Sequence, residues 1–331
     1  MSPIARSTPR LPQFVERKIY KTGQTRGADD DEIFQNRVGR NSTVLIPLPM
    51  WDRCMSVEYE KGFIVLVSPS WYFNKDHKGE ALQELGLALG VNALIFYQSR
   101  VDWVDLPPPT SWAVATARTA PLGGKYVARI AGTTAAADGG RINHGYTTTG
   151  MKGAGIRVYE YAPSTTITQC RIQLEAILWL CEDAIEALET CGMDHMDAES
   201  RKKAVLAEAA AQNLLDMDAL HAARMVDNDG VTICPLCLER LTAMGFANRM
   251  EQAEGREVPD LTITEVSLFH IQELRYGVLN HRPYNLGWGH HHCNVVAKDS
   301  GIIPTVQWMH ETVARNVASG WTPIGLEQLF P

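Results

Sequence analysis

Apolar residues in the first half of the chain come in short runs bounded by Gly, Pro, Asn or Asp, a pattern typical of strands joined by turns. Between two of these runs, residues 80–89 are apolar at helical spacing and are followed by Gly90, which predicts one helix with a glycine cap. The expected strands are 42–48, 62–68, 91–97, 125–130 and 152–161.

From Thr165 the apolar period becomes helical. We expect one long helix that ends near Cys191–Gly192, a second helix over 197–215 and a short third over 218–225. This region is acidic, with 13 acids against 5 bases in residues 171–230. We therefore expect it to serve as a scaffold or subunit interface and not as a catalytic centre.

Composition places the chain among ordinary globular proteins, with 331 residues, 45% hydrophobic and 21% charged. A chain of this length usually forms about two domains. No apolar stretch is long enough for a membrane span, and the N-terminus lacks the apolar segment of a secretory signal. Seven scattered cysteines do not resemble a disulfide framework, so we expect a cytoplasmic protein with no membrane partner.

Charge is segregated along the chain. The net charge is −7, but residues 1–26 carry six basic groups against one acid, and residues 115–157 carry six against one. A partner with a phosphate backbone would explain two basic stretches in an acidic protein.

The candidate chemistry lies between 231 and 299. Cys234 and Cys237 form a Cys-x-x-Cys pair, and His290 and Cys293 have the same two-residue gap. Three thiolates and one imidazole suit a closed, tetrahedral structural zinc site. His291 or His292 could replace His290, and a redox role for the two first cysteines remains an alternative.

Three more polar residues stand at fixed positions around these ligands. His270 is embedded near the end of an apolar strand, 266–271, while Asn285 precedes and Asn294 directly follows the second ligand pair. Each has a structural alternative: a core histidine, a turn former and a helix N-cap. We expect Trp288 to pack in a core.

Together these residues resemble the HNH (ββα-metal) nuclease superfamily over about seventy residues. The resemblance implies two strands and a helix around one catalytic cation, with zinc holding the unit. It implies that His270 is the general base, that Asn285 braces the active-site loop and that Asn294 binds the cation. Cys234, Cys237, His290 and Cys293 match the zinc clamp.

The chemistry of phosphodiester hydrolysis fits these roles, since it needs a base for water and a cation beside the phosphate. An amide oxygen suits Mg²⁺ or Mn²⁺. The chain departs from the family at Phe269, where many members have an aspartate that binds the cation; Glu265 or Glu273 could contribute instead. His281 is a rival base. Further positive charge is expected from Arg275, Arg282 and Lys298.

The N-terminal stretches 19–27 and 35–42 are rich in Arg, Gln, Asn and Gly, which contact bases and backbone. With the small nuclease unit, they resemble a type II restriction endonuclease, and 21–27 and 285–294 are similar to the BstXI-like group. This resemblance implies double-stranded DNA as substrate, an interrupted palindromic site, a homodimer and a cognate DNA methyltransferase. The candidate DNA-binding residues are Lys21, Arg26, Arg37 and Arg40.

The expected fold is α+β: a strand-rich DNA-recognition domain over 1–165, an acidic helical scaffold or dimerisation region over 166–230, and a zinc-stabilised HNH nuclease domain over 231–331. The alternatives are a modification-dependent or homing-type HNH endonuclease and a non-catalytic zinc-containing DNA-binding protein.

Overall fold

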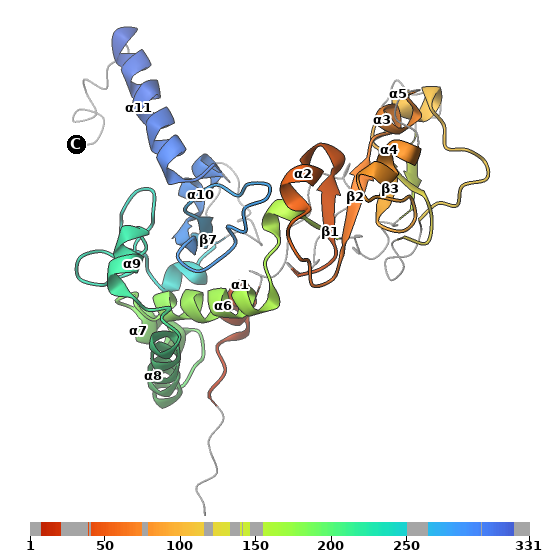
Figure 1. The fold of residues 1–331 in the computed structure, drawn as a ribbon. Helices are drawn as coiled ribbons and strands as arrows, with labels where there is room; N and C mark the ends of the chain where they lie inside the picture. The colour runs from red at the N-terminus through yellow and green to blue at the C-terminus, as the bar shows by residue number, and fades with distance from the viewer. Residues whose placement is uncertain are drawn as a thin grey trace, which may run out of the picture. The chain divides into compact units, whose positions relative to one another are not determined.

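The computed structural model describes residues 8–20, 39, 41–74, 79–115, 122–132, 140, 142–145, 155–249, 264–298 and 300–320. The chain has the mixed α+β architecture that the sequence predicts and divides into two compact units, shown in Figure 1. Unit 1 comprises Met1–Ile19, Gln169–Leu274 and Arg282–Pro331, and unit 2 comprises Tyr20–Thr168 and Arg275–His281. The three-domain division at residues 165 and 230 stays a prediction.

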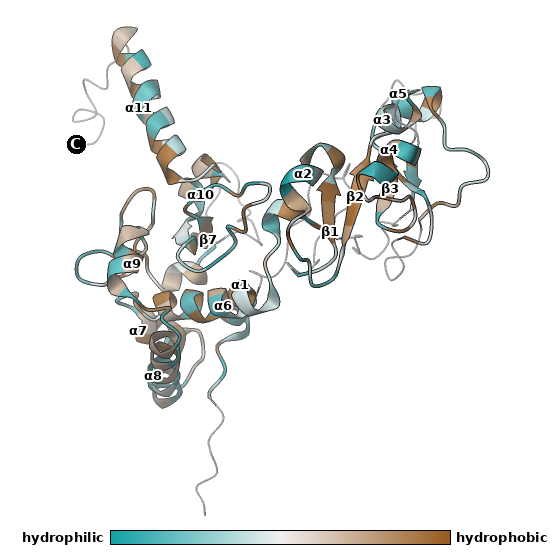
Figure 2. Cartoon of the chain, in the orientation of Figure 1, coloured by the Kyte–Doolittle hydropathy of each residue, from teal (hydrophilic) through white to brown (hydrophobic). Residues whose placement is uncertain are grey.

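Unit 2 is built on a six-stranded sheet. Neighbouring strands are parallel except for β4 and β5, which are antiparallel, and the order is β5-β4-β3-β2-β1-β6. The first four strands confirm four of the predicted apolar runs, and β1 and β2 are strongly apolar in Figure 2. The strands are β1 (Val44–Pro47), β2 (Phe63–Val67), β3 (Ala93–Tyr97), β4 (Tyr126–Ile130), β5 (Ile142–His144) and β6 (Ile156–Arg157).

Alternate side chains of these strands fill two separate cores. Val44 and Ile46 belong to a large cluster that also includes Trp51, whereas Leu45 and Phe96 belong to a smaller cluster on the other face. Short helices connect the strands on the larger side: α2 (Trp51–Cys54), α3 (Pro69–Phe73), α4 (Gly79–Glu84) and α5 (Arg100–Asp105), with 3-10 turns at η2 (Leu48–Met50) and η3 (Val158–Glu160). Both faces of the sheet are therefore apolar.

The expected strand over 152–161 is wrong for most of its described length. Only Ile156–Arg157 pairs with β1, and the chain then turns into η3. Two residues are enough to place this short strand at the edge of the sheet, beside β1.

Unit 1 is mostly helical and also contains a two-stranded antiparallel sheet. Its helices are α1 (Gln13–Tyr20), α6 (Ser164–Leu178), which begins in unit 2, α7 (Ala184–Thr190), α8 (His195–Ala211), α9 (Met217–Ala222), η4 (Met244–Phe246), α10 (His291–Ala297) and α11 (Ile302–Ala318). Its strands are β7 (Val266–His270) and β8 (Leu286–His290), which confirms the strand predicted around His270.

The single long helix expected from 165 to 191 is instead two helices, α6 and α7. Thr232 bonds to the end of α6: its backbone nitrogen donates to the Leu180 carbonyl at 3.4 Å, and its hydroxyl donates to the Ile177 carbonyl. The Asp183 carboxylate accepts the backbone N–H groups of Ala243 at 2.6 Å and Met244 at 3.1 Å. Contacts distant in sequence therefore break a helix that local periodicity predicts as continuous.

One apolar core joins the helices of unit 1 to its sheet. Trp288 is buried, as predicted; its indole donates a 2.8 Å hydrogen bond to the Leu174 carbonyl, and its ring packs edge-on against Phe246. The core therefore ties the two-stranded sheet to α6. Within the described residues, no helix is both long and apolar enough to span a membrane.

Candidate metal centre and nuclease site

Cys234 and Cys237 lie on a tight turn. The backbone N–H of Cys234 donates to the Glu239 carbonyl at 2.8 Å, and that of Leu238 donates to the Cys234 carbonyl at 2.9 Å. Leu238 adopts a left-handed conformation with φ of 65°, which closes the turn. This geometry directs both thiols to the same side.

The second pair of ligands lies where β8 meets α10. His290 is the last residue of β8, and Cys293 lies in the first turn of α10. The His290 N–H donates to the Cys234 sulfur at 3.4 Å, and Cys237 Sγ lies 3.3 Å from His290 Nδ1. The cluster is thus assembled from two segments more than fifty positions apart.

These four ligand atoms all lie within 4.8 Å of one another, and among the described residues they form the one such group of three or more His, Cys, Asp or Glu side chains. In a tetrahedral zinc site with Zn–S bonds of about 2.3 Å, two sulfurs lie about 3.8 Å apart. The donor set and its spacing therefore fit a structural zinc ion. Of the three adjacent histidines, His290 is the one whose ring nitrogen lies with the three sulfurs, and His292 stacks on the His290 ring with 5.2 Å between centroids.

Burial controls ionisation in this cluster. It raises the pKa of Cys293, and the nearby Cys234 and Cys237 raise it further. Burial also lowers the pKa of His290, as does the neighbouring His292. The imidazole is thus kept neutral, the form that binds metals, while the thiols would ionise on binding a cation.

The strands β7 and β8 and the helix α10 form a β-β-α arrangement, and β8 and α10 carry two members of the cluster. In β7 and β8, Val266 pairs with His290 and His270 pairs with Leu286. The α10 helix begins directly after β8, and its Asn294 Nδ2 donates to the Ser267 hydroxyl of β7 at 3.4 Å.

Asn285 braces the chain next to His270. Its side chain is fully buried, and Oδ1 accepts the Gln272 backbone N–H at 2.6 Å. The Asn285 carbonyl also accepts the N–H of Ile271 at 3.0 Å. Asn285 therefore holds the backbone of the two residues immediately after His270.

Asn294 of α10 contacts Ser267 of β7, which lies three positions before His270. Phe269 is buried on the Ser267 side, against the Gly289 position. Residue 269 therefore supplies an aromatic ring to the core and no metal ligand. Asn294 alone fits one coordination position of a hard cation, and the described donors do not form a complete magnesium site.

The other candidate residues differ in their burial. Arg275 and His281 belong to unit 2, where the first is exposed and the second is fully buried. Arg282 and Lys298 are exposed in unit 1. The Glu265 carboxylate accepts from Asn248 at 3.4 Å, and Glu273 is partly buried. Lys21, Arg26, Arg37 and Arg40 lie outside the described residues.

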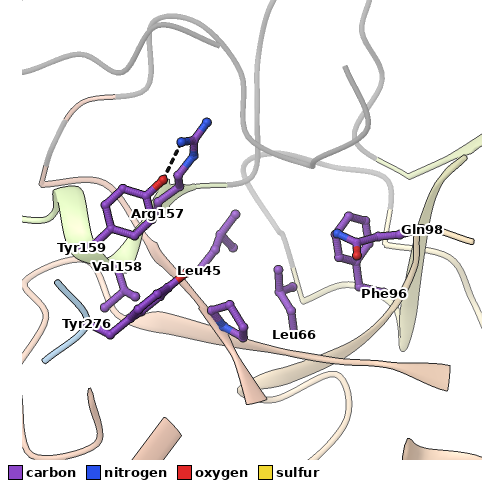
Figure 3. Close-up of a pocket in the computed structure, with 9 residues that line it drawn as sticks. Leu45, Leu66, Phe96, Gln98, Arg157, Val158, Tyr159 and Tyr276 are labelled. Atoms are coloured by element: carbon purple, nitrogen blue, oxygen red, sulfur yellow. Dashed lines mark hydrogen bonds between the residues drawn. The ribbon is translucent and has the colours of Figure 1, made fainter. Parts of the chain in front are cut away.

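Sequence reasoning missed a hollow in unit 2. It lies at the carboxyl ends of β1, β2 and β3, with a volume of about 100 Å³. Its floor is apolar, whereas Arg157, Tyr159 and Gln98 supply polar groups at its rim, as Figure 3 shows. The lining residues are Leu45, Pro47, Leu66, Phe96, Gln98, Arg157, Val158, Tyr159 and Tyr276.

The polar end of the hollow is tightly organised. The Arg157 guanidinium donates to the Tyr159 hydroxyl, and the Tyr159 ring packs edge-on against Tyr276 with 5.4 Å between centroids. Burial raises the pKa of Tyr159 to about 12, so this phenol is neutral at physiological pH. Gln98 directly follows the apolar run of β3, and polar residues at strand ends are the signal that could have located this site.

Comparison with curated proteins and with solved structures found no match for the chain. A sequence model of the family described as BstXI restriction endonuclease matches residues 17–291. The match begins in α1, contains all of the described residues of unit 2 and extends through β8. The matched region covers most of the chain, and the chain therefore belongs to the BstXI restriction endonuclease family.

Proposed function

We propose that this protein is a type II restriction endonuclease that cleaves double-stranded DNA by an HNH-type mechanism centred on His270. Its family supports site-specific DNA cleavage. The observation that favours the HNH mechanism is the β7–β8–α10 arrangement, with a Cys₃His cluster at its base and a braced histidine at the end of β7.

In this proposal, His270 accepts a proton from the attacking water. A neutral imidazole can do so near pH 7. Asn285 acts as a positioning residue, because its 2.6 Å hydrogen bond fixes the backbone of Gln272 and thereby the end of β7. Asn294 would supply one oxygen to a Mg²⁺ or Mn²⁺ ion, which stabilises charge on the leaving oxygen when it is bound.

The structural zinc has a separate role. Cys234, Cys237, His290 and Cys293 would occupy all four tetrahedral positions, which leaves none for water or substrate. Zinc would therefore hold β8 and α10 against the 234–237 turn and take no part in hydrolysis.

We assign DNA recognition to unit 2. Arg, Gln and Tyr side chains gather at the carboxyl edge of its parallel strands, where open α/β sheets commonly bind ligands. The sheet order reverses at β1, whose neighbours are β2 and β6, and the hollow lies at this reversal. Homodimerisation, an interrupted palindromic site and a cognate methyltransferase remain predictions from the restriction-enzyme class.

The test is cleavage of a large double-stranded DNA by the purified full-length protein and by His270→Ala, each with Mg²⁺ and with chelator. We expect discrete, metal-dependent fragments from the native protein and a loss of cleavage of about 10²- to 10⁴-fold in the variant. Zinc content and DNA binding should stay unchanged. His221→Ala, which removes an exposed histidine of α9, is the matched control.

Near-normal cleavage by His270→Ala would contradict the proposed base and direct attention to His281. If the native protein cut only methylated DNA, it would be a modification-dependent enzyme. Binding without cleavage of either DNA would identify a non-catalytic DNA-binding protein.

A further inference from the structure

The last described helix, α11, carries an exposed apolar stripe. Its members recur every three or four residues, so they lie on one side of the helix. They are Ile303 (81% exposed), Val306 (43%), Met309 (43%), Val313 (55%) and Val317 (47%). Large exposed apolar patches on soluble proteins usually mark interaction surfaces.

Only the beginning of α11 is used by the core of unit 1. Ile302 is buried, and its backbone N–H donates to the Ile271 carbonyl at 2.9 Å. Thr305, one turn later, is also buried. The rest of the helix extends away from β7 and α10, as Figure 1 shows. The core therefore anchors α11 but does not cover the stripe.

The stripe is symmetric about its middle to within one residue. Ile303 and Val317 lie seven residues before and after His310, and Val306 and Val313 lie four before and three after it. In an antiparallel pair of α11 helices, Val306 of one chain would thus face Val313 of the other. With the same axis, Ile303 and Val317, about 21 Å apart at 1.5 Å per residue, would come within one residue of facing each other at the two ends.

The charges of α11 also permit two identical faces to meet. Its one acid and one base, Glu311 and Arg315, lie on the other side of the helix, 3.7 Å apart as an ion pair. The stripe itself carries no Asp, Glu, Lys or Arg. By contrast, residues 171–230 carry 13 acids against 5 bases, so two copies of that region would repel each other.

We propose that two copies of this chain associate through α11, packed antiparallel about a two-fold axis near Met309 and His310. A two-fold contact uses the same patch on both subunits, which the spacing and neutrality of the stripe satisfy. The dimer contact is then α11 and not the acidic region 166–230 that the sequence favoured. The proposal does not depend on His270 or on the mechanism of cleavage.

Sedimentation equilibrium of the full chain tests the association. We expect a dimer, and at least a hundredfold larger dissociation constant for Val313→Lys, since it would bury a charge in the contact. The substituted side chain is exposed in the single subunit, so folding should survive, as circular dichroism would check. Gln307→Lys is the control, because it adds the same charge outside the stripe.

The antiparallel geometry has its own test. Val306→Glu and Val313→Lys should each be monomeric alone, but their mixture should form a heterodimer, because the new acid of one chain faces the new base of the other. In a parallel pair the two substitutions would not meet, and mixing would restore nothing. A monomeric native chain, or a dimer unaffected by Val313→Lys, would overturn the proposal.

Discussion

The Cys₃His cluster and the His270 group both use β8 and α10 or the strand beside them, yet they are organised in different ways. The cluster brings four donors within 4.8 Å, from the 234–237 turn and from the junction of β8 and α10. His270 and Asn294, in contrast, lie on β7 and α10 without a comparable set of donors among the described residues, and Asn285 and Ile302 both bond to the backbone beside His270. A structural site must be complete in the chain itself, whereas a nuclease site is completed by its cation and by phosphate oxygens.

The largest effect should come from breaking the cluster. Cys293→Ser removes one of four zinc ligands, and in such sites metal binding is folding free energy. We expect loss of zinc and a fall of several kcal/mol in the free energy of unfolding of unit 1. Zinc analysis and thermal melting would measure both. Cys191→Ser changes a partly exposed thiol outside the cluster and should preserve zinc and stability; equal effects in both variants would contradict the assignment.

A substitution at Asn285 would separate a role in stabilising the fold from a role in positioning His270 for cleavage. Asn285→Ala leaves the partly buried Gln272 N–H without its 2.6 Å acceptor, which should cost about 1 kcal/mol of stability. If Asn285 positions His270, the rate of cleavage should also fall, by more than the loss of folded protein explains. The fall should appear in kcat and not in KM. Asn285→Asp keeps an acceptor oxygen and should recover part of kcat. A loss of stability with normal kcat would leave Asn285 a purely structural residue.

Unit 2 extends the comparison to the region that should contact DNA. Among the described residues, Arg157 is the one cation that lines the hollow. We expect Arg157→Gln to lower the DNA affinity about tenfold and to make it less dependent on salt. Fluorescence anisotropy with duplex DNA at several salt concentrations would measure this. Arg53→Gln, at an exposed position of α2, should have a smaller effect. Identical losses in the two variants would mean that the hollow has no special role.

The smallest effect concerns pH. Because burial raises the folded-state pKa of Tyr159 to about 12, the folded protein holds this proton more tightly than the unfolded chain. The stability that results is fully present below about pH 10, the ordinary tyrosine pKa, and is lost as the pH rises toward 12. Between pH 8 and pH 11, the melting temperature of Tyr159→Phe should therefore fall less than that of the native protein. An unchanged pH dependence would contradict the shift.

Residue spacing was sufficient to predict the members of the Cys₃His cluster, because each two-residue gap lets a pair of donors lie on the same side of the chain. The apolar runs of β1 to β4 were similarly predictable, since strands buried in a parallel sheet are continuously apolar. Each donor pair and each of these strands depends on neighbours in sequence, so the sequence contains them directly.

Features that depend on distant contacts were not predictable. In β8, Gly287 and Gly289 oppose strand propensity, yet a Cβ at Gly289 would lie 2.6 Å from the Phe269 ring, so glycine is required there by a partner on β7. The end of α6 depends on Thr232, and the hollow is formed by strand ends together with Tyr276 from the β7–β8 connection. Local patterns contain none of these relations.

The first helix of the chain has a consequence for synthesis. Lys18 of α1 donates its ammonium to the Val266 carbonyl at the start of β7 at 3.0 Å, across 248 positions. At translation rates of about 5–20 residues per second, α1 waits roughly 12–50 s for this partner to emerge. Most residues of unit 2 leave the ribosome in the interval. Unit 1, which carries the candidate nuclease chemistry, can therefore be assembled only after most of unit 2 and β7 have been made.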